Sequence, residues 1–123
     1  MDKNLEESLK QKYPEMLANA GKIWCDDGWH PIISSALACI EIHLKRNPKP
    51  FQFTQIKEKF SGLRMYNEGA DEYIQGVISM AETMSYKTCE VTGEPGVRCV
   101  KGGYIRTLSP AKAEELGFSV FTK

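Results

Sequence analysis

Four cysteines and two histidines are the residues of this 123-residue chain that could hold a metal or act as nucleophiles. A structural zinc site needs four thiolate or imidazole ligands, which usually come from cysteine pairs a few residues apart. Cys89 is followed three residues later by Thr92, Cys99 lies ten residues beyond Cys89, and neither histidine has zinc-pair spacing with them. We therefore interpret Cys89 and Cys99 as small buried thiols in a hairpin. A site assembled across the fold with Cys25 or a histidine stays open.

The segment "QIKEKFSGLRMY" is the best candidate for a binding surface. It carries three cations and an aromatic ring that could hold a phosphate or stack a base: Lys57, Lys59, Arg64 and Tyr66. A two-residue loop would place Lys57 opposite Arg64, and such a like-charge pair favours an anionic partner. A three-residue loop ending at a left-handed Gly62 would place Glu58 opposite Arg64, so that the charges satisfy each other. Because Gly62 stands where the longer loop needs glycine, we predict that loop and a structural role.

A second basic surface is expected on the hairpin near the C-terminus, where three cations again accompany a tyrosine: Arg98, Lys101, Tyr104 and Arg106. Together with Lys112 they could contact the phosphates of a nucleic acid. However, sixteen basic residues balance sixteen acidic ones, and duplex affinity depends on several phosphate contacts. Nucleic-acid binding by this hairpin is therefore kept as the alternative to the function favoured below.

The segment "WCDDGWH" places two aspartates beside His30, a combination that could serve a metal or acid–base chemistry. The commoner reading is a turn leading into a helix, with Trp24 and Trp29 anchoring the core. His43 lies among polar positions of that helix and is predicted to be solvated. The sequence contains no G-x-S-x-G, P-loop or G-x-G-x-x-G motif, so we predict that the protein is not an enzyme.

Helical and strand-type periods alternate along the chain. A short helix is expected from an N-cap at Asn4 to about Tyr13, with another turn from Pro14. A central helix from Pro31 buries the stripe Ile33, Ala36, Leu37, Ile40 and Leu44. A later helix from Ala70 buries Tyr73, Ile74, Val77, Ile78, Ala81 and Met84. Ser109 and Pro110 begin a last short helix that Gly117 closes.

These elements predict an α+β fold in the order ααββαββα, with two short antiparallel hairpins packed on the central helix. A chain of 123 residues suits a single domain spanning residues 1–123. No segment is apolar enough for a signal peptide or a membrane span, so we expect a cytoplasmic protein with reduced cysteines and no membrane partner. Short edge strands and the aromatic hairpin leave room for a homodimer.

Four segments together resemble a family of small uncharacterised proteins of tailed phages and prophages: "KYPEML", "GWHPII", "QIKEKFSGLRMY" and "CEVTGEPG…GGYIRTLSPAKAEELG". The similarity runs from about Tyr13 to Gly117. It implies a zinc-ribbon-like tail at residues 88–117, since many relatives carry cysteine or histidine ligands at the positions of Cys89, Thr92, Ser109 and Lys112. Only Cys89 keeps a ligand here, so no zinc or other cofactor is expected. The tail should instead close through Val91, Val97, Tyr104 and Ile105 and the Ser109 cap.

The resemblance and the missing catalytic motifs together favour a non-enzymatic binding protein. It would act in the cytoplasm of a bacterial host, either docking on a host protein or sequestering a small anionic ligand. Countering a host defence system is one role that phage proteins of this size can serve. We expect the binding residues on the two basic hairpins described above.

Overall fold

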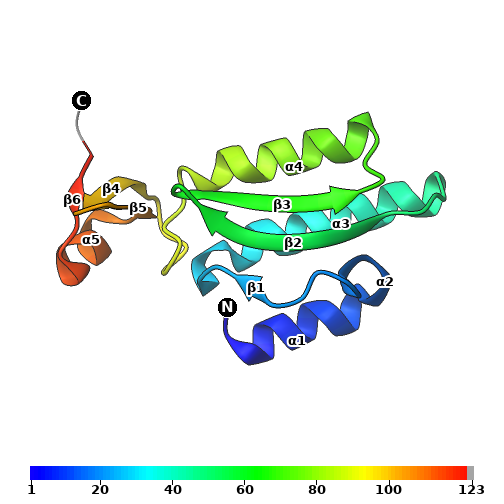
Figure 1. Cartoon of the computed structure of the whole chain (residues 1–123), viewed down its shortest axis with the longest axis horizontal. Coiled ribbons are helices and arrows are strands. Elements are labelled where there is room, and N and C mark those ends of the chain that lie inside the picture. Colours follow the sequence, from blue (N-terminus) through cyan, green and yellow to red (C-terminus); the bar gives the residue numbers. More distant parts are fainter. Residues whose placement is uncertain (122–123) are drawn as a thin grey trace.

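Residues 1–121 are described by a computed structural model, in which helices are combined with two small sheets (Figure 1). The α+β class predicted from the sequence is confirmed. The first sheet has the order β1-β2-β3 and the second the order β5-β4-β6. The element order differs from the predicted ααββαββα in a few places. The turn expected from Pro14 forms a separate short helix, a 3₁₀ turn precedes the central helix, and the sequence did not reveal two strands of two residues each, β1 (Ile23–Trp24) and β6 (Ser119–Val120).

The N-terminal helices begin and end at polar and proline signals. The carboxylate of Asp2 accepts hydrogen bonds from the N–H groups of Asn4 and Leu5, so α1 (Lys3–Lys12) begins before the predicted cap at Asn4. Tyr13 ends α1, and Pro14 begins α2 (Pro14–Leu17) as predicted.

The central helix α3 (His30–Arg46) follows the 3₁₀ turn η1 (Asp27–Trp29). Its predicted stripe is confirmed, with Leu44 partly buried and Ile32 added to the buried set. Trp29 is fully buried and donates its indole N–H to the carbonyl oxygen of Thr88 at 2.9 Å. Trp24 does not anchor the core as predicted, because it lies on β1 and is exposed.

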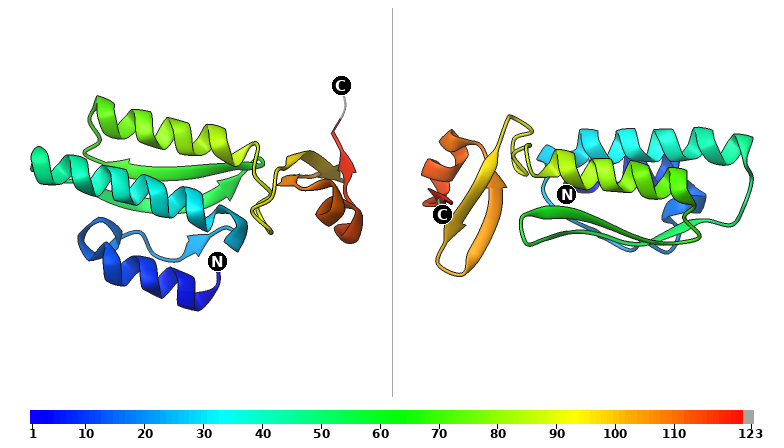
Figure 2. Two further views of the ribbon diagram at one scale, coloured as in Figure 1. Left: turned by 180° about the vertical axis from the view of Figure 1, so that it is seen from behind. Right: turned by 90° about the horizontal axis from the view of Figure 1, so that it is seen from above.

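The first sheet pairs β2 (Gln52–Lys59) with β1 in parallel and with β3 (Gly62–Glu68) in an antiparallel hairpin. One extra residue at Thr54 interrupts the β2–β3 register. The bulge allows Phe53 and Ile56, three positions apart, both to be fully buried. Helices α3 and α4 lie on one side of this sheet (Figure 2, right).

Helix α4 (Glu72–Ser85) begins at Asp71, whose carboxylate accepts from the N–H of Ile74. Ile74 and Ala81 are buried as predicted. Tyr73 and Met84, which were expected on the same buried face, are exposed. The buried stripe is narrower than predicted because α4 packs mainly on α3 and β3, and side chains on its other sides, such as Met80, are exposed.

The second hairpin pairs β4 (Val97–Lys101) with β5 (Tyr104–Leu108) around a Gly102-Gly103 turn, as predicted. Helix α5 (Pro110–Leu116) follows at once, with Ser109 as its N-cap and a left-handed Gly117 at its end. These local signals were read correctly from the sequence. Strand β6 adds to β4 on the side away from β5.

The second hairpin does not pack on the central helix, which corrects the prediction. Residues 86–96 carry the chain past the end of α4, so the hairpin lies at one end of the molecule and is covered by α5 (Figures 1 and 2). The tail has its own small core of fully or largely buried residues: Cys89, Cys99, Leu108 and Ala113. Of the residues predicted to close it, Val91 packs there, whereas Val97 and Tyr104 are exposed.

Candidate functional site

The β2–β3 turn has two residues, not the predicted three. Lys59 lies opposite Gly62, and both turn residues are left-handed, with φ 51° at Phe60 and 69° at Ser61. This conformation matches a type I′ turn, in which both central residues need positive φ. Gly62 serves a different purpose from the one inferred, because a Cβ there would lie 2.6 Å from the Tyr86 ring. Close packing, and not backbone conformation, requires glycine at this position.

The shorter turn reverses the predicted charge pairing. Lys57 now lies opposite Arg64, and Glu58 lies opposite Leu63. On the other side of β2, Trp24 of β1 lies opposite Lys57. Since residues in register point to the same face, these three side chains form a row across all three strands. The neighbouring row, Ile23, Ile56 and Met65, is buried in the core.

A lysine lies near each exposed aromatic ring of this region. The Nζ of Lys22 lies 4.6 Å from the centroid of Trp24, and that of Lys57 lies 6.0 Å from the centroid of Tyr66. At the turn, the Nζ of Lys59 lies 5.7 Å from the Phe60 ring. These distances suit cation–π contacts. We define the open sheet face by these three pairs of residues: Lys22 and Trp24, Lys57 and Tyr66, Lys59 and Phe60.

The rings of the open sheet face are accessible. Trp24 is 57% exposed, Tyr66 40% and Phe60 68%. The two long helices cover the opposite side of the sheet, and no element of residues 1–121 lies over the outer side (Figure 2, right). Within the same residues, none of its three lysines forms an ion pair. The face therefore combines accessible rings with uncompensated positive charge.

Arg64 differs from these lysines because its charge is already matched. Its Nη1 lies 2.6 Å from the Glu82 carboxylate and donates to the Tyr86 hydroxyl at 2.9 Å. Burial acts to lower the pKa of Arg64, but the bonds with Tyr86 and Glu82 outweigh it and raise the pKa. Arg64 thus fixes β3 to the end of α4, and its predicted binding role gives way to a structural one.

The predicted tail surface is largely occupied by internal contacts. Lys101 donates to the carbonyl oxygen of Leu116 at 3.0 Å, at the end of α5. Arg98 lies 5.6 Å from the Phe121 ring. Tyr104 is 75% exposed, and Lys101, which lies opposite it in the β4–β5 register, is the lysine that bonds to Leu116. The cations proposed for nucleic-acid binding by this hairpin therefore stabilise the tail itself.

Arg106 joins the tail to the first half of the molecule. Its Nη2 lies 2.6 Å from the Asp26 carboxylate and 3.3 Å from that of Glu90. Glu90 is buried, and its burial raises the pKa of the carboxyl group, while Asp26 N–H and Arg106 act against this shift. Arg106 compensates a buried negative charge, so it is a structural residue and not a free contact for a ligand.

The two carboxylates of the acidic turn and the imidazole of His43 lie in separate contacts. Asp26 pairs with Arg106, and Asp27 accepts from the backbone N–H of Asp2, so the two carboxylates serve separate contacts. His43 is not solvated as predicted. Its Nε2 lies 2.6 Å from Asp71, and its ring stacks on Tyr73 with centroids 4.2 Å apart. The pair fastens the start of α4 to α3.

Cys89 and Cys99 are fully buried, as the sequence indicated. Burial raises the pKa of Cys89, but hydrogen bonds from Thr92 and from the N–H groups of Ser109 and Val91 outweigh it and lower the pKa. Thr92 and Ser109 are positions at which the resemblance implies ligands in relatives. Here the Ser109 hydroxyl caps α5.

A zinc ion does not fit the side chains present in the tail. The Lys112 ammonium pairs with Glu115, which leaves Cys89 as the one cysteine at these four positions. Within residues 1–121, no three cysteine, histidine or acidic side chains are grouped as metal ligands would be. Burial raises the pKa of Cys25 to about 12, so that thiol is unsuited to act as a nucleophile.

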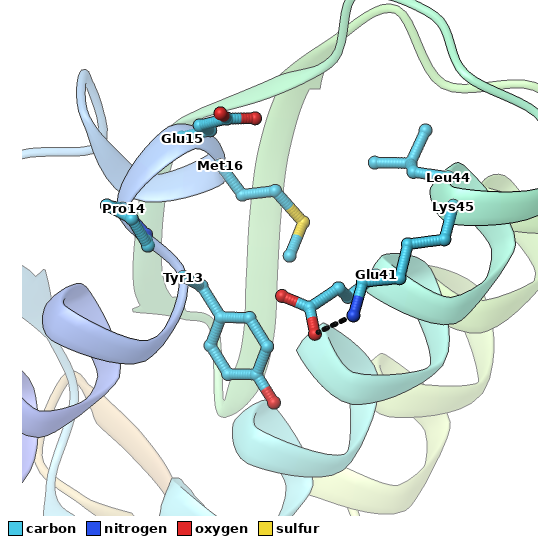
Figure 3. Close-up of a pocket in the computed structure, with 7 residues that line it drawn as sticks. All are labelled: Tyr13, Pro14, Glu15, Met16, Glu41, Leu44 and Lys45. Atoms are coloured by element: carbon cyan, nitrogen blue, oxygen red, sulfur yellow. Dashed lines mark ion pairs between the residues drawn. The ribbon is translucent and has the colours of Figure 1, made fainter.

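Two hollows elsewhere on the surface offer less chemistry. One lies between α2 and α3, where Met16 projects inward and the Glu41 carboxylate is paired with Lys45 at 3.5 Å (Figure 3). The other is an apolar groove between α3 and α4, bordered by the exposed Met80 and Met84. Neither brings together groups for acid–base or nucleophilic catalysis.

Comparisons of this chain with protein-family models, with curated proteins and with solved structures give no match. Among the described residues, no helix combines the length and apolar character that crossing a bilayer requires.

Proposed function

We propose that the protein is a small non-enzymatic binding module whose open sheet face receives an anionic partner. The observation that carries this proposal is the row of aromatic–lysine pairs on an uncovered sheet face. The proposal keeps Lys57, Lys59 and Tyr66 as binding residues and adds Lys22, Trp24 and Phe60.

The two basic hairpins are not equally suited to this role. On the tail hairpin, Lys101 and Arg106 are committed to internal partners, and on β3 Arg64 is committed to α4. Lys22, Lys57 and Lys59 have no such commitment within residues 1–121. Nucleic-acid binding through the tail, the alternative suggested by the sequence, is therefore disfavoured.

The resemblance to phage proteins supports the cellular setting of the proposal. From it we infer a bacterial cytoplasm, where host macromolecules or small ligands carry anionic groups and where blocking a defence system would be a use for such binding. A second copy of the chain is not required, since the open sheet face is built from one polypeptide.

The test is retention on heparin–agarose during a rising salt gradient. A variant with Lys22→Gln, Lys57→Gln and Lys59→Gln should elute at clearly lower salt than the wild type. The control is Lys3→Gln, Lys12→Gln and Lys45→Gln, which removes the same charge from exposed positions on helices α1 and α3. It should elute close to the wild type. Equal shifts in the two variants, or none, would overturn the proposal.

A further inference from the structure

We propose that the anionic partner of the open sheet face is a single-stranded nucleic acid, an inference that rests on the anion-binding function proposed above. Charge alone does not explain this face, because a small anion would need only the lysines. The exposed rings require an explanation of their own. The strand register brings Trp24 of β1 and Tyr66 of β3 to one face of the sheet, and Phe60 lies in the β2–β3 turn at the end of that sheet.

The arrangement of the rings suits stacked bases. Trp24 and Tyr66 lie on the two outer strands of the sheet with β2 between them. Two strand spacings separate Trp24 and Tyr66 sideways by about 10 Å. Trp24 pairs with Lys57 and Tyr66 pairs with Gln55, so the two rings are also offset by two residues along β2. Bases splayed from one strand can occupy separate rings on such a sheet, as in other open sheets that stack two or three bases. Stacking tolerates any sequence because every base has a π-face.

The lysines are placed to contact the phosphate backbone of the same nucleic-acid strand. Each exposed ring has its own lysine within about 6 Å, so positive charge alternates with ring surface across the face. A nucleic-acid strand that stacks its bases on the rings therefore brings its phosphates close to the lysine ammonium groups. The carboxylates nearest to Trp24 are already used: Asp26 and Glu90 pair with Arg106, and Glu58 accepts from the Ser61 N–H.

A duplex is a poorer partner for this surface. Its bases are stacked inside the helix and cannot reach the rings, so only the lysine contacts would remain. The chain carries no net charge, and duplex binding depends on many phosphate contacts. An acidic protein surface would also engage the lysines, but it would leave three exposed rings without a matching group.

The turn provides an independent sign that the face is kept for binding. Phe60 holds a left-handed backbone, φ 51°, which is costly for a bulky residue, and its ring is still directed into solvent. Asparagine or glycine would form this turn at lower cost. Backbone strain at a residue whose side chain does not pack against the rest of the protein is typical of ligand sites.

The experiment measures fluorescence anisotropy of a labelled single-stranded oligothymidylate and a labelled oligouridylate with the full-length protein at low salt. Trp24→Ala and Tyr66→Ala should each weaken binding by roughly 5- to 150-fold, the range expected for the loss of one stacked base. The matched control is Tyr104→Ala, which removes a still more accessible ring from the tail and should bind like the wild type. Lys57→Gln should reduce the slope of log affinity against log salt by about 0.7.

The outcomes separate this inference from the function on which it rests. If heparin retention depends on the three lysines but no single strand binds, the single-strand inference is wrong and the anion-binding proposal stands. The same holds if a duplex or a polyglutamate peptide binds as tightly as the oligonucleotides, or if the ring variants bind like Tyr104→Ala. Failure of both the heparin and the anisotropy assays overturns both proposals. Circular dichroism of each variant confirms that a loss of binding is not a loss of fold.

Discussion

Asp71 illustrates how one side chain can begin a helix and fasten it to a neighbour. One carboxylate oxygen accepts from the Ile74 N–H at 2.9 Å, and the other lies 2.6 Å from His43 Nε2 and 3.1 Å from Lys49 Nζ. The hydrogen bond from Ile74, followed by that from His43, holds the pKa of Asp71 well below its ordinary range. The charged form of this residue is therefore the one that the fold stabilises.

Replacing Asp71 by asparagine should lower the melting temperature at neutral pH but not in strong acid. Asparagine can still cap α4, but it loses the charge that His43 and Lys49 contact. A depressed carboxyl pKa contributes stability above the unfolded value, 3.8, and loses it as the pH falls through the folded value. The difference between wild type and Asp71→Asn, followed by thermal unfolding, should therefore shrink below about pH 4. A difference that stays constant with pH would contradict this account.

Ser61 is a second residue whose environment predicts a measurable effect. It is left-handed and fully buried, and its hydroxyl has no hydrogen-bond partner among the described residues. Ser61→Gly should stabilise the protein by about 1–2 kcal/mol, since glycine adopts this conformation freely and carries no buried hydroxyl.

The two contributions at Ser61 can be separated with Ser61→Ala, which removes the hydroxyl but keeps the unfavourable backbone. Urea unfolding of the three proteins gives the comparison. We expect alanine to fall between serine and glycine in free energy of unfolding. A destabilised Ser61→Gly would show that the turn depends on the serine side chain.

At the scale of elements, the sequence predicted what local signals determine. Helix α3 has a continuous apolar stripe, and α5 has Ser109, Pro110 and Gly117 at its boundaries, so both were found. The strands β1 and β6 were missed because two-residue strands have no period and depend on a partner strand for their hydrogen bonds. The buried face of α4 was overestimated because apolar periodicity does not reveal how much of a helix is covered.

The candidate site was only partly accessible to the same reasoning. Lys57, Lys59 and Tyr66 were identified from composition, but the register was wrong because Gly62 was taken as a turn glycine. Its requirement comes from the Tyr86 ring, which is distant in the chain. Trp24 was assigned to the core. Ile23, Trp24 and Cys25 are all apolar, so the sequence has no alternation that would separate the exposed Trp24 from its buried neighbours.

The tail as an element should fold without metal. Its interior is filled by the buried side chains of Cys89, Cys99, Leu108 and Ala113. Ser109, as the N-cap of α5, holds the chain around these side chains through its hydrogen bonds. We expect less than stoichiometric zinc by elemental analysis, and a melting temperature unchanged by EDTA. A bound zinc ion whose chelation melts the protein would show that a metal site is part of the fold.

At the scale of the whole molecule, the core of the first sheet with its helices and the small core of the tail are joined by hydrogen bonds that we call the polar seam. The Gly28 N–H donates to the carbonyl oxygen of Glu90 at 2.7 Å, and the Thr107 hydroxyl donates to that of Ser61 at 2.8 Å. Gly28 permits this approach, because a Cβ there would collide with the backbone of Cys89 and Glu90. The seam also contacts the β2–β3 turn, so tail and open sheet face are mechanically connected through Ser61.

Arg106→Met should destabilise the protein by about 2–4 kcal/mol, because it leaves the buried Glu90 carboxylate without its cation. Arg98→Met is the matched control. It removes the same charge from the same hairpin, where Arg98 is exposed and lies near the Phe121 ring, and should change stability by less than about 0.5 kcal/mol. Urea unfolding measures both.

The double variant Arg106→Met with Glu90→Gln tests the cause, because it leaves no uncompensated charge buried at this position and should recover much of the lost stability. The pH dependence gives a second check. A carboxyl group with a raised folded pKa binds more protons in the native state, so its contribution to stability declines as the pH rises through that value. Arg106→Met should therefore lose more stability relative to the wild type near neutral pH than in mild acid. A loss that is independent of pH, and that Glu90→Gln fails to restore, would mean that packing of the Arg106 side chain holds the two cores together.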